Sequence, residues 1–423
     1  MPASPSTARA INDRLALRLL QQEGPLTAGQ LKQLTGLSRP TVADLVERLT
    51  VAGLVAVVGE SGEQRRGPNA RVYGIVADQA HLAALDVRTE GVSVVVSDLL
   101  GEVLAEASVP IGGDTGTGPA VERAVALVEQ VAKEADAVRE PPRGPVPGRG
   151  RLHTVGIGAP GLIDPATGEL RDSSGLPAWH RRLVAALQDR LPARVLVENE
   201  TNLAALAEQR DGAARERDTF VLLWLGHGAG AAVILDGRLR RGASGGTGEI
   251  GFLPVPGTSG LPSATDCEGG FHSLAGAMAV AALAAECEVV AEAAPYEPHA
   301  AALVRRAVAT ADAPHSGRFL DALADRLAIG AASVIAVLDP GCVVLGGEIG
   351  QAGGDVLAER VSARLVRMSP LPTEVRASAL GGGAVLRGAL LMARDEAQEE
   401  LFAPAAPTHS RRLGAAPPDP RPA

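Results

Sequence analysis

Residues 26–55 read LTAGQLKQLTGLSRPTVADLVERLTVAGLV and predict two short helices joined by a tight turn and followed by a strand. Thr27 can cap the first helix, and Gln30 three residues further on can close a capping box. Leu31 and Leu34 give this helix an apolar side. The stretch therefore predicts a compact helical hairpin that leads into a β-strand.

The turn and the second helix carry the signals that bear on function. Gly36 supplies the backbone freedom that a sharp turn needs, and Ser38 can cap the helix that follows. The apolar residues of this helix recur at i, i+3, i+4 and i+7, and are Val42, Leu45, Val46 and Leu49. The opposite face is polar and offers Ser38, Arg39, Thr41 and Arg48 as candidate contacts to a DNA major groove. The alternative is a helical hairpin whose polar face is only solvated.

The flanking segments favour DNA binding. A third helix is expected upstream over residues 11–22, and strands are expected downstream over 54–58 and 71–76. The two strands and their basic connection predict a wing, with Arg65, Arg66 and Arg71 as candidate phosphate contacts. Residues 1–77 hold nine Lys and Arg against six Asp and Glu, whereas the whole chain has a formal net charge of −9. This asymmetry is typical of a chain that meets nucleic acid at one end.

Length and composition point to a multidomain, cytoplasmic protein. The chain has 423 residues, of which 46% are hydrophobic and 2% aromatic, which suits a large α/β body. Its three cysteines, Cys267, Cys287 and Cys342, are scattered, so a reducing compartment is expected and a disulfide framework is not. No apolar run reaches the length of a membrane span. Residues 396–423 lack periodicity and are expected to be a disordered tail, and residues 139–151 to be an exposed loop.

Residues 78–395 alternate predicted strands and helices and predict two similar α/β halves, with a boundary near residues 211–219. Glycine-rich turns follow the strands at residues 225–230, 241–251 and 345–350. Exposed backbone N–H groups in such turns can hold phosphates or sugar hydroxyls. Together with residues 159–164, they predict a ligand cleft between the halves.

The body resembles the ROK family of repressors and sugar kinases. The matching segments are GIGAPGLID (156–164), SSGLPAW (173–179), VENETNLAALAE (197–208), GHGAGAAVILDGRLRRGASGGTGEIGF (226–252) and VLDPGCVVLGGEIG (337–350). The resemblance implies a two-lobed fold of the actin and hexokinase type. A winged helix ahead of such a body resembles the transcriptional repressors of this family, which respond to sugars or sugar derivatives.

Several departures from the family pattern argue against catalysis. Family kinases begin with Asp-Ile-Gly-Gly-Thr at the first phosphate loop, where this chain has Asp86-Val-Arg-Thr-Glu90. The family's catalytic aspartate corresponds to Glu200, whose longer side chain moves the carboxylate by about one methylene. The family's zinc ligands are reduced to Cys267, and Phe252 replaces the zinc-binding histidine, so a structural zinc is not expected. ATP and Mg²⁺ are expected only if the chain is a kinase.

Four side chains remain as candidate ligand contacts in the cleft: Asn199, Glu200, Glu249 and His272. The alternative is that they cap or brace the glycine-rich turns. Three functional hypotheses follow. The first is a regulator, expected to repress, that acts as a homodimer on operator DNA and binds a sugar effector without catalysis. The second is an active ATP-dependent sugar kinase with a regulatory DNA-binding head and Glu200 as its base. The third is a regulator that ignores sugars.

Overall fold

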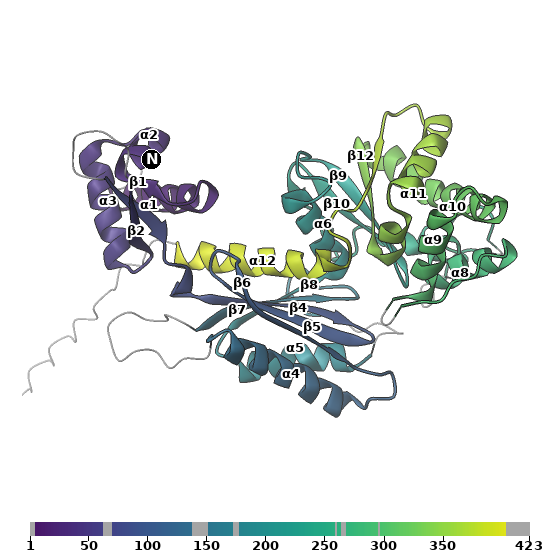
Figure 1. Ribbon diagram of the computed structural model, residues 1–423, viewed down its shortest axis with the longest axis horizontal. Coiled ribbons are helices and arrows are strands. Elements are labelled where there is room, and N and C mark those ends of the chain that lie inside the picture. The colour runs from purple at the N-terminus through teal and green to yellow at the C-terminus, as the bar shows by residue number, and fades with distance from the viewer. Residues whose placement is uncertain are drawn as a thin grey trace, which may run out of the picture. The chain divides into compact units, whose positions relative to one another are not determined.

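The computed structural model describes residues 5–61, 70–137, 151–171, 177–258, 260–263, 268–294 and 297–402 (Figure 1). The chain forms two compact units, Met1–Val76 with Gln398–Ala423 and Ala77–Ala397. The first unit is a winged helix-turn-helix and the second is a two-lobed α/β body, as the sequence predicts.

The first unit packs three helices against a small sheet. Its elements are α1 (Pro5–Gln22), β1 (Leu26–Thr27), α2 (Ala28–Thr35), α3 (Arg39–Val51), β2 (Val55–Ser61) and β3 (Ala70–Ile75). The strands lie in the order β1-β3-β2 and pair antiparallel. The hairpin of β2 and β3 is the predicted wing. Strand β1 escapes prediction because two residues are too few to show a strand period.

The helix caps follow from the sequence. Thr27 Oγ1 accepts from the Gln30 N–H at 3.2 Å, and Gln30 Oε1 accepts from the Thr27 N–H at 2.9 Å. Gly36 ends α2 with a φ of 69°, and Ser38 Oγ accepts from the first turn of α3. The expected role of Leu34 is wrong, since its side chain is 49% exposed. Helix α2 has only eight residues, and Leu31 is its one buried position.

The first lobe of the body is a five-stranded sheet covered by helices. Its elements are η1 (Ala77–Gln79), β4 (His81–Arg88), β5 (Gly91–Asp98), β6 (Val103–Pro110), α4 (Thr117–Glu134), β7 (Leu152–Ala159), α5 (Trp179–Arg190), β8 (Arg194–Asn199) and α6 (Glu200–Asp211). The strand order is β6-β5-β4-β7-β8. Helices α4 and α5 cover one face of this sheet, and α12 (Ala384–Leu401) crosses the other (Figure 1).

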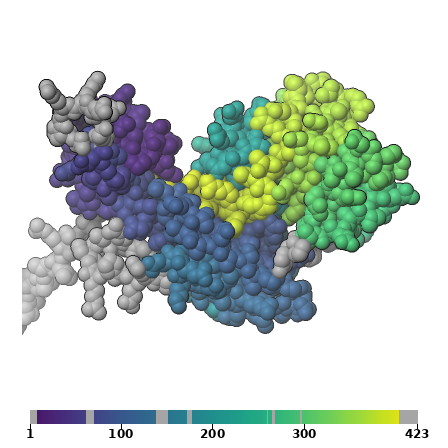
Figure 2. Space-filling view, viewed as in Figure 1, coloured from purple at the N-terminus to yellow at the C-terminus, as the bar shows by residue number. Residues whose placement is uncertain are grey.

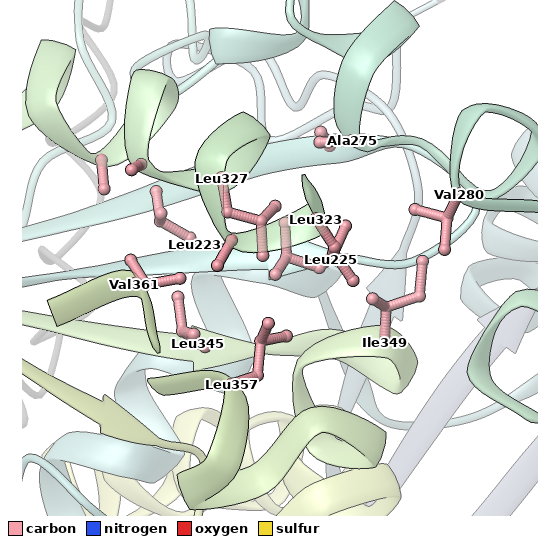
Figure 3. Packing of buried hydrophobic residues seen from close by; sticks show 14 of the residues in the cluster. Leu223, Leu225, Ala275, Val280, Leu323, Leu327, Leu345, Ile349, Leu357 and Val361 are labelled. Carbon is pink, nitrogen blue, oxygen red and sulfur yellow. The ribbon is translucent and has the colours of Figure 1, made fainter. Parts of the chain in front are cut away.

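The second lobe repeats this topology. Its elements are β9 (Phe220–Leu225), β10 (Ala229–Leu235), β11 (Arg238–Leu239), η2 (Ile250–Phe252), α7 (His272–Ala275), α8 (Ala277–Glu286), α9 (His299–Ala309), α10 (Pro314–Leu338), β12 (Cys342–Gly346), α11 (Gly347–Met368), β13 (Glu374–Ala377) and η3 (Gly381–Gly383). The strand order is β11-β10-β9-β12-β13, so both lobes follow a hairpin-then-parallel plan. In the core, β9 and β12 pack against α10 and α11 through buried leucines such as Leu223, Leu345 and Leu327 (Figure 3).

Helix α12 approaches the first sheet closely because glycines line the contact. A Cβ atom added to Gly156 of β7 would lie 2.3 Å from the carbonyl oxygen of Ala389, and one added to Gly388 would lie 2.0 Å from that of Leu203. Ion pairs from Arg387 to Asp211, at 2.6 Å, and from Asp395 to α6 fix its outer side. In Figure 2 the yellow atoms of this helix lie against the blue surface of the first lobe.

The end of α12 corrects the predicted tail. The helix continues to Leu401, past residue 396, and residues 398–402 cluster with the first unit. There Glu399 accepts a hydrogen bond from Arg14 at 2.6 Å, and Phe402 is 5% exposed. Residues 403–423, and the predicted loop at 139–150, lie outside the described residues. Within the described ranges, no helix has both the length and the apolar character that crossing a membrane requires.

We expect Gly156→Ala to lower the unfolding free energy of the body by about 1–3 kcal/mol, because the added methyl group meets backbone that must shift. The chain's two tryptophans, Trp179 and Trp224, both lie in the body, so tryptophan fluorescence during urea unfolding reports on this unit. Gly118→Ala is the control, because its Cβ meets nothing within 4 Å on helix α4. This control should be neutral or slightly stabilising; equal effects of the two changes would contradict the proposed packing.

Candidate functional site

The cleft side of the first lobe begins where β8 passes into α6. Asn199 caps α6, because its Oδ1 accepts from the N–H groups of Thr201 and Asn202, at 2.9 Å and 3.3 Å. Its side-chain amide donates to the carbonyl of Gly161 and to Glu200 Oε2, both at 3.0 Å. These bonds use the amide for capping and for bracing the glycine turn, which was the alternative to ligand binding.

Glu200 lies at the centre of a group of carboxylates. It retains some accessible surface, but protein atoms enclose it, and the negative charges of Asp86, Glu249 and Glu348 act on it. Burial first, and these three charges next, raise the pKa of Glu200 to about 8. Its carboxyl group is therefore mostly protonated at neutral pH and can donate one hydrogen bond as well as accept others.

Arg88 joins the two lobes through an ion-pair network. Its Nε donates to Asp86 Oδ2 and its Nη1 to Glu348 Oε1, both at 2.8 Å. Its Nη2 donates to the carbonyl of Gly382 at 3.4 Å. Burial opposes the positive charge of Arg88, but Asp86 and Glu348 outweigh it and raise the pKa of the guanidinium. Burial also raises the pKa of Asp86, against the opposing effect of Arg88. Arg88, the bulky residue at a glycine position of the family's first phosphate loop, is thus held in ion pairs with Asp86 and Glu348.

The second lobe contributes Glu249 and His272 from different places. Glu249 keeps exposed surface, but desolvation raises its pKa, and its charge acts on Glu200. His272 lies instead beside the turn at Gly228, where an added Cβ would be 3.4 Å from its Nδ1. Burial, and then the charge of His227, lower the pKa of His272. The structure therefore groups Glu200 with Glu249 and sets His272 beside His227.

Two further contacts tie the lobes together. Arg241, in the glycine-rich segment after β11, donates to Glu198 Oε2 at 2.6 Å. The Glu198 carboxylate is 4% exposed and also accepts from Asn202 at 2.9 Å. At the far end of α6, the buried Glu208 accepts from the Ser378 hydroxyl and from the Leu380 N–H at 3.1 Å. Helix α6 is thus held to the second lobe near both of its ends.

In the first unit, the start of α3 is the most available candidate DNA surface. Arg39 is exposed at the first helical position. Ser38 Oγ and Thr41 Oγ1 lie 2.7 Å apart and share a hydrogen bond. Arg48 is committed within the unit, since its Nη2 lies 2.5 Å from Asp13 Oδ1 and its Nη1 pairs with Asp44. Arg48 is thus paired within the unit in this structure, and its role as a groove contact stays a prediction.

The wing is described only in part. Arg71 is exposed on β3, opposite Glu60 in the strand register, and so can face a phosphate backbone. Arg65 and Arg66 lie outside the described residues, as does Cys267. Among the residues that are described, no cluster of three or more His, Cys, Asp or Glu side chains could hold a metal ion.

Sequence reasoning missed Glu348 and Glu198. Glu348 stands in the segment Leu345-Gly-Gly-Glu-Ile-Gly350, which was interpreted only as a glycine-rich turn. An acid inside a turn expected to accept phosphate was the available signal, and it matches the unusual Arg88 in the first loop. Glu198 had no such signal, because its partner Arg241 lies 43 residues away in the other lobe.

Comparisons with known proteins agree with this architecture. The model of the ROK family matches residues 92–396, and that of the MarR family matches residues 11–67. A xylose repressor from Caldicellulosiruptor bescii is 26% identical over 250 residues, covering 58% of this chain and 59% of that protein. The DNA-binding transcriptional dual regulator NagC of Escherichia coli is 27% identical over 249 residues, covering 58% of each chain. The chain spans about three fifths of the length of these curated relatives.

Two solved structures show the same fold. A ROK family transcriptional regulator, described as a homologue of the Escherichia coli MLC protein, superposes with a TM-score of 0.71 at 20% identity, covering 93% of this chain and 98% of that one. The ROK hexokinase from Thermus thermophilus superposes with a TM-score of 0.58 at 27% identity, covering 75% of this chain and 99% of that one.

We expect the stability of the body to fall as pH rises from about 4.5 to 8, because Glu200 stays protonated in the folded state where the unfolded chain ionises. Glu200→Gln cannot ionise and so removes this loss of stability. The unfolding free energy of the variant should equal that of the parent near pH 4.5 and exceed it at pH 9 by on the order of a few kcal/mol. Urea unfolding followed by tryptophan fluorescence at pH 4.5, 7 and 9 measures this difference.

Glu297→Gln is the control for that series. The hydrogen bond from Arg305 lowers the pKa of Glu297 to about 2, so this surface carboxylate is ionised in both states above pH 5. The difference between Glu297→Gln and the parent should stay constant from pH 5 to 9. A constant difference for Glu200→Gln as well would show that Glu200 is not a buried, protonated acid.

Proposed function

The chain belongs to the ROK family, and we propose that it is a cytoplasmic transcriptional regulator, acting as a repressor, whose DNA-binding unit responds to a sugar or sugar derivative held in the body cleft. The observation that carries this proposal is the order of parts: a winged helix-turn-helix with an exposed polar helix start, followed by a two-lobed body in which acids from both lobes gather around Glu200. The relatives named as repressors support the same assignment.

DNA contact is assigned to the start of α3 and to the wing. Arg39 can reach a base edge from the first turn of α3, where the free N–H groups of a helix start also favour a phosphate. Arg71 can meet the backbone from β3. Because the net positive charge of residues 1–77 is small, useful affinity needs two heads. We therefore propose a homodimer on a two-fold operator with half-sites about 10 base pairs apart, or a multiple of that.

Ligand recognition is assigned to the cleft around Glu200 and Glu249. A protonated Glu200 can donate to one sugar hydroxyl and accept from another, and Glu249 can accept from a third. Helix α6 starts at Glu200 and is bonded to the second lobe at Glu208. A ligand that contacts Glu200 and prefers one of two arrangements of the lobes therefore affects the position of this helix. Such a ligand shifts DNA affinity only by the difference between its affinities for the two arrangements.

The kinase alternative has one observation in its favour and one against it. A carboxyl group with a raised pKa, such as Glu200, suits a general base. However, the Arg88–Glu348 ion pair stands where the phosphate loops meet, and no glycine is left in the first loop to admit a polyphosphate. We therefore propose binding without phosphoryl transfer, with neither ATP nor Mg²⁺ as a cofactor.

Arg39→Ala should weaken binding to a duplex selected by the full chain from a random pool about 5- to 150-fold, because it removes a base contact worth roughly 1–3 kcal/mol. Arg71→Ala should weaken all duplexes alike and reduce the salt slope by about 1. Fluorescence anisotropy over a salt series measures both effects. Arg123→Ala, on the exposed side of α4 in the body, removes the same charge and should change neither. Unchanged affinity in Arg39→Ala would place the DNA surface elsewhere.

Calorimetry against a panel of free pentoses, hexoses and amino sugars should detect at least one ligand for the full chain, and that ligand should lower the affinity for the selected duplex. An assay that couples ADP release to NADH oxidation should show no turnover above background with the same sugars and ATP. Turnover abolished by Glu200→Gln would instead establish the kinase. No response to any sugar would favour a regulator with a vestigial cleft.

A further inference from the structure

Arg88 and Glu348 form a direct ion pair between the two lobes of the body. Arg88 ends β4 in the first lobe, and Glu348 lies in the first turn of α11 in the second lobe. Their 2.8 Å ion pair is extended by Asp86 on one side and by the carbonyl of Gly382 on the other. All three donor nitrogens of the Arg88 guanidinium therefore have partners inside the protein.

The Glu348 carboxylate fills the space between Arg88 and a glycine turn. It stands at the start of α11, whose helical backbone is interrupted at Gly354. It lies against the turn after β9, since a Cβ added to Gly226 would be 2.6 Å from Glu348 Oε2. The anion that the guanidinium holds beside this turn is therefore a side chain of the protein itself.

The charge balance around this pair disfavours a second anion. Asp86, Glu249 and Glu348 act on Glu200, and Arg88 is the one cation ion-paired with any of these four acids in the part of the chain that the structure describes. A phosphate dianion entering here would meet the three carboxylates and a guanidinium whose three nitrogens each already donate to a protein oxygen. An uncharged hydroxyl or an ammonium group meets no such repulsion.

We propose that Arg88 and Glu348 are specificity-determining residues of the site around Glu200, because their ion pair stands where the resemblance places the first phosphate loop and so restricts the site to sugars that are neutral or carry an amine. Sugar phosphates and nucleotides are rejected. This inference rests on the proposed function as a sugar-responsive regulator and deepens it by naming the class of effector. In this proposal the body binds a sugar without a nucleotide. Arg88 and Glu348 supply the positive and the negative charge of the pair, so no phosphate group is needed beside Arg88.

Inorganic phosphate is the first probe, because it tests the place of this ion pair without any sugar. Wild-type chain should bind it weakly or not at all by calorimetry. Glu348→Gln keeps the side chain's size, removes its charge and frees Arg88, so phosphate should bind at least tenfold more tightly. The double variant Arg88→Met with Glu348→Gln should lose that gain. Trp224, whose Nε1 lies 3.1 Å from a Cβ added at Gly226, gives an independent fluorescence readout.

Glu297→Gln is the matched control. It frees Arg305 from its carboxylate partner outside the group around Glu200 and leaves Arg88 paired, so phosphate affinity should change less than threefold. An equal gain in Glu297→Gln and Glu348→Gln, or a gain that survives in the double variant, would overturn the assigned role of the pair. Phosphate binding by the wild-type chain as tight as in Glu348→Gln would do the same. The thermal midpoint of each variant confirms that it is folded.

Sugar pairs extend the test to the effector class. Glucose, glucosamine and N-acetylglucosamine are each compared with their 6-phosphates. A neutral or amino sugar that binds wild-type chain should bind at least tenfold more tightly than its phosphate, and Glu348→Gln should narrow that ratio. A preference for the phosphate would overturn the proposal. Binding of no sugar at all would overturn the proposed sugar response, while the phosphate series would still decide the role of Arg88 and Glu348.

Discussion

The close approach of α12 to the first sheet is the constraint on which the body depends. Gly156 and Gly388 remove the side chains that would otherwise hold the helix away from β7 and α6. With that face covered, the central strands β4 and β7 are buried along almost their whole length, as their near-continuous apolar sequences require. The same contact fixes α6, whose first residue, Glu200, is the centre of the cleft.

Ion pairs hold the two lobes together around Glu200. Arg88 pairs with both Asp86 and Glu348, and Arg241 pairs with Glu198. In the two pairs that join the lobes, the arginine comes once from the first lobe and once from the second. The Asp86 and Glu198 carboxylates of these pairs are buried while their arginines are partly exposed, so removing the arginine would leave a desolvated charge without its partner. Glu200 has no ion-paired cation, and burial raises its pKa so that it keeps its proton instead.

Much of this could be predicted from the sequence. Helix periods and caps gave the winged helix, and strands alternating with helices gave two α/β halves, because these signals lie within a few residues of one another. The rest depends on contacts between distant segments. The position of Arg48 on its helix predicts a groove contact, but its guanidinium donates to Asp13, 35 residues earlier in the chain. Glu348 is only an unusual acid in a glycine-rich turn until Arg88, 260 residues away, is placed beside it.

The last turn of α12 has a consequence for the timing of synthesis. Residues 398–402 cluster with the winged helix, where Glu399 holds Arg14 and Phe402 is buried. A ribosome makes these residues only after the roughly 320 residues of the second unit, which takes on the order of half a minute. During that interval the nascent first unit lacks the Glu399 partner of Arg14 and the buried Phe402, so its last contacts form only in chains whose body has already been made.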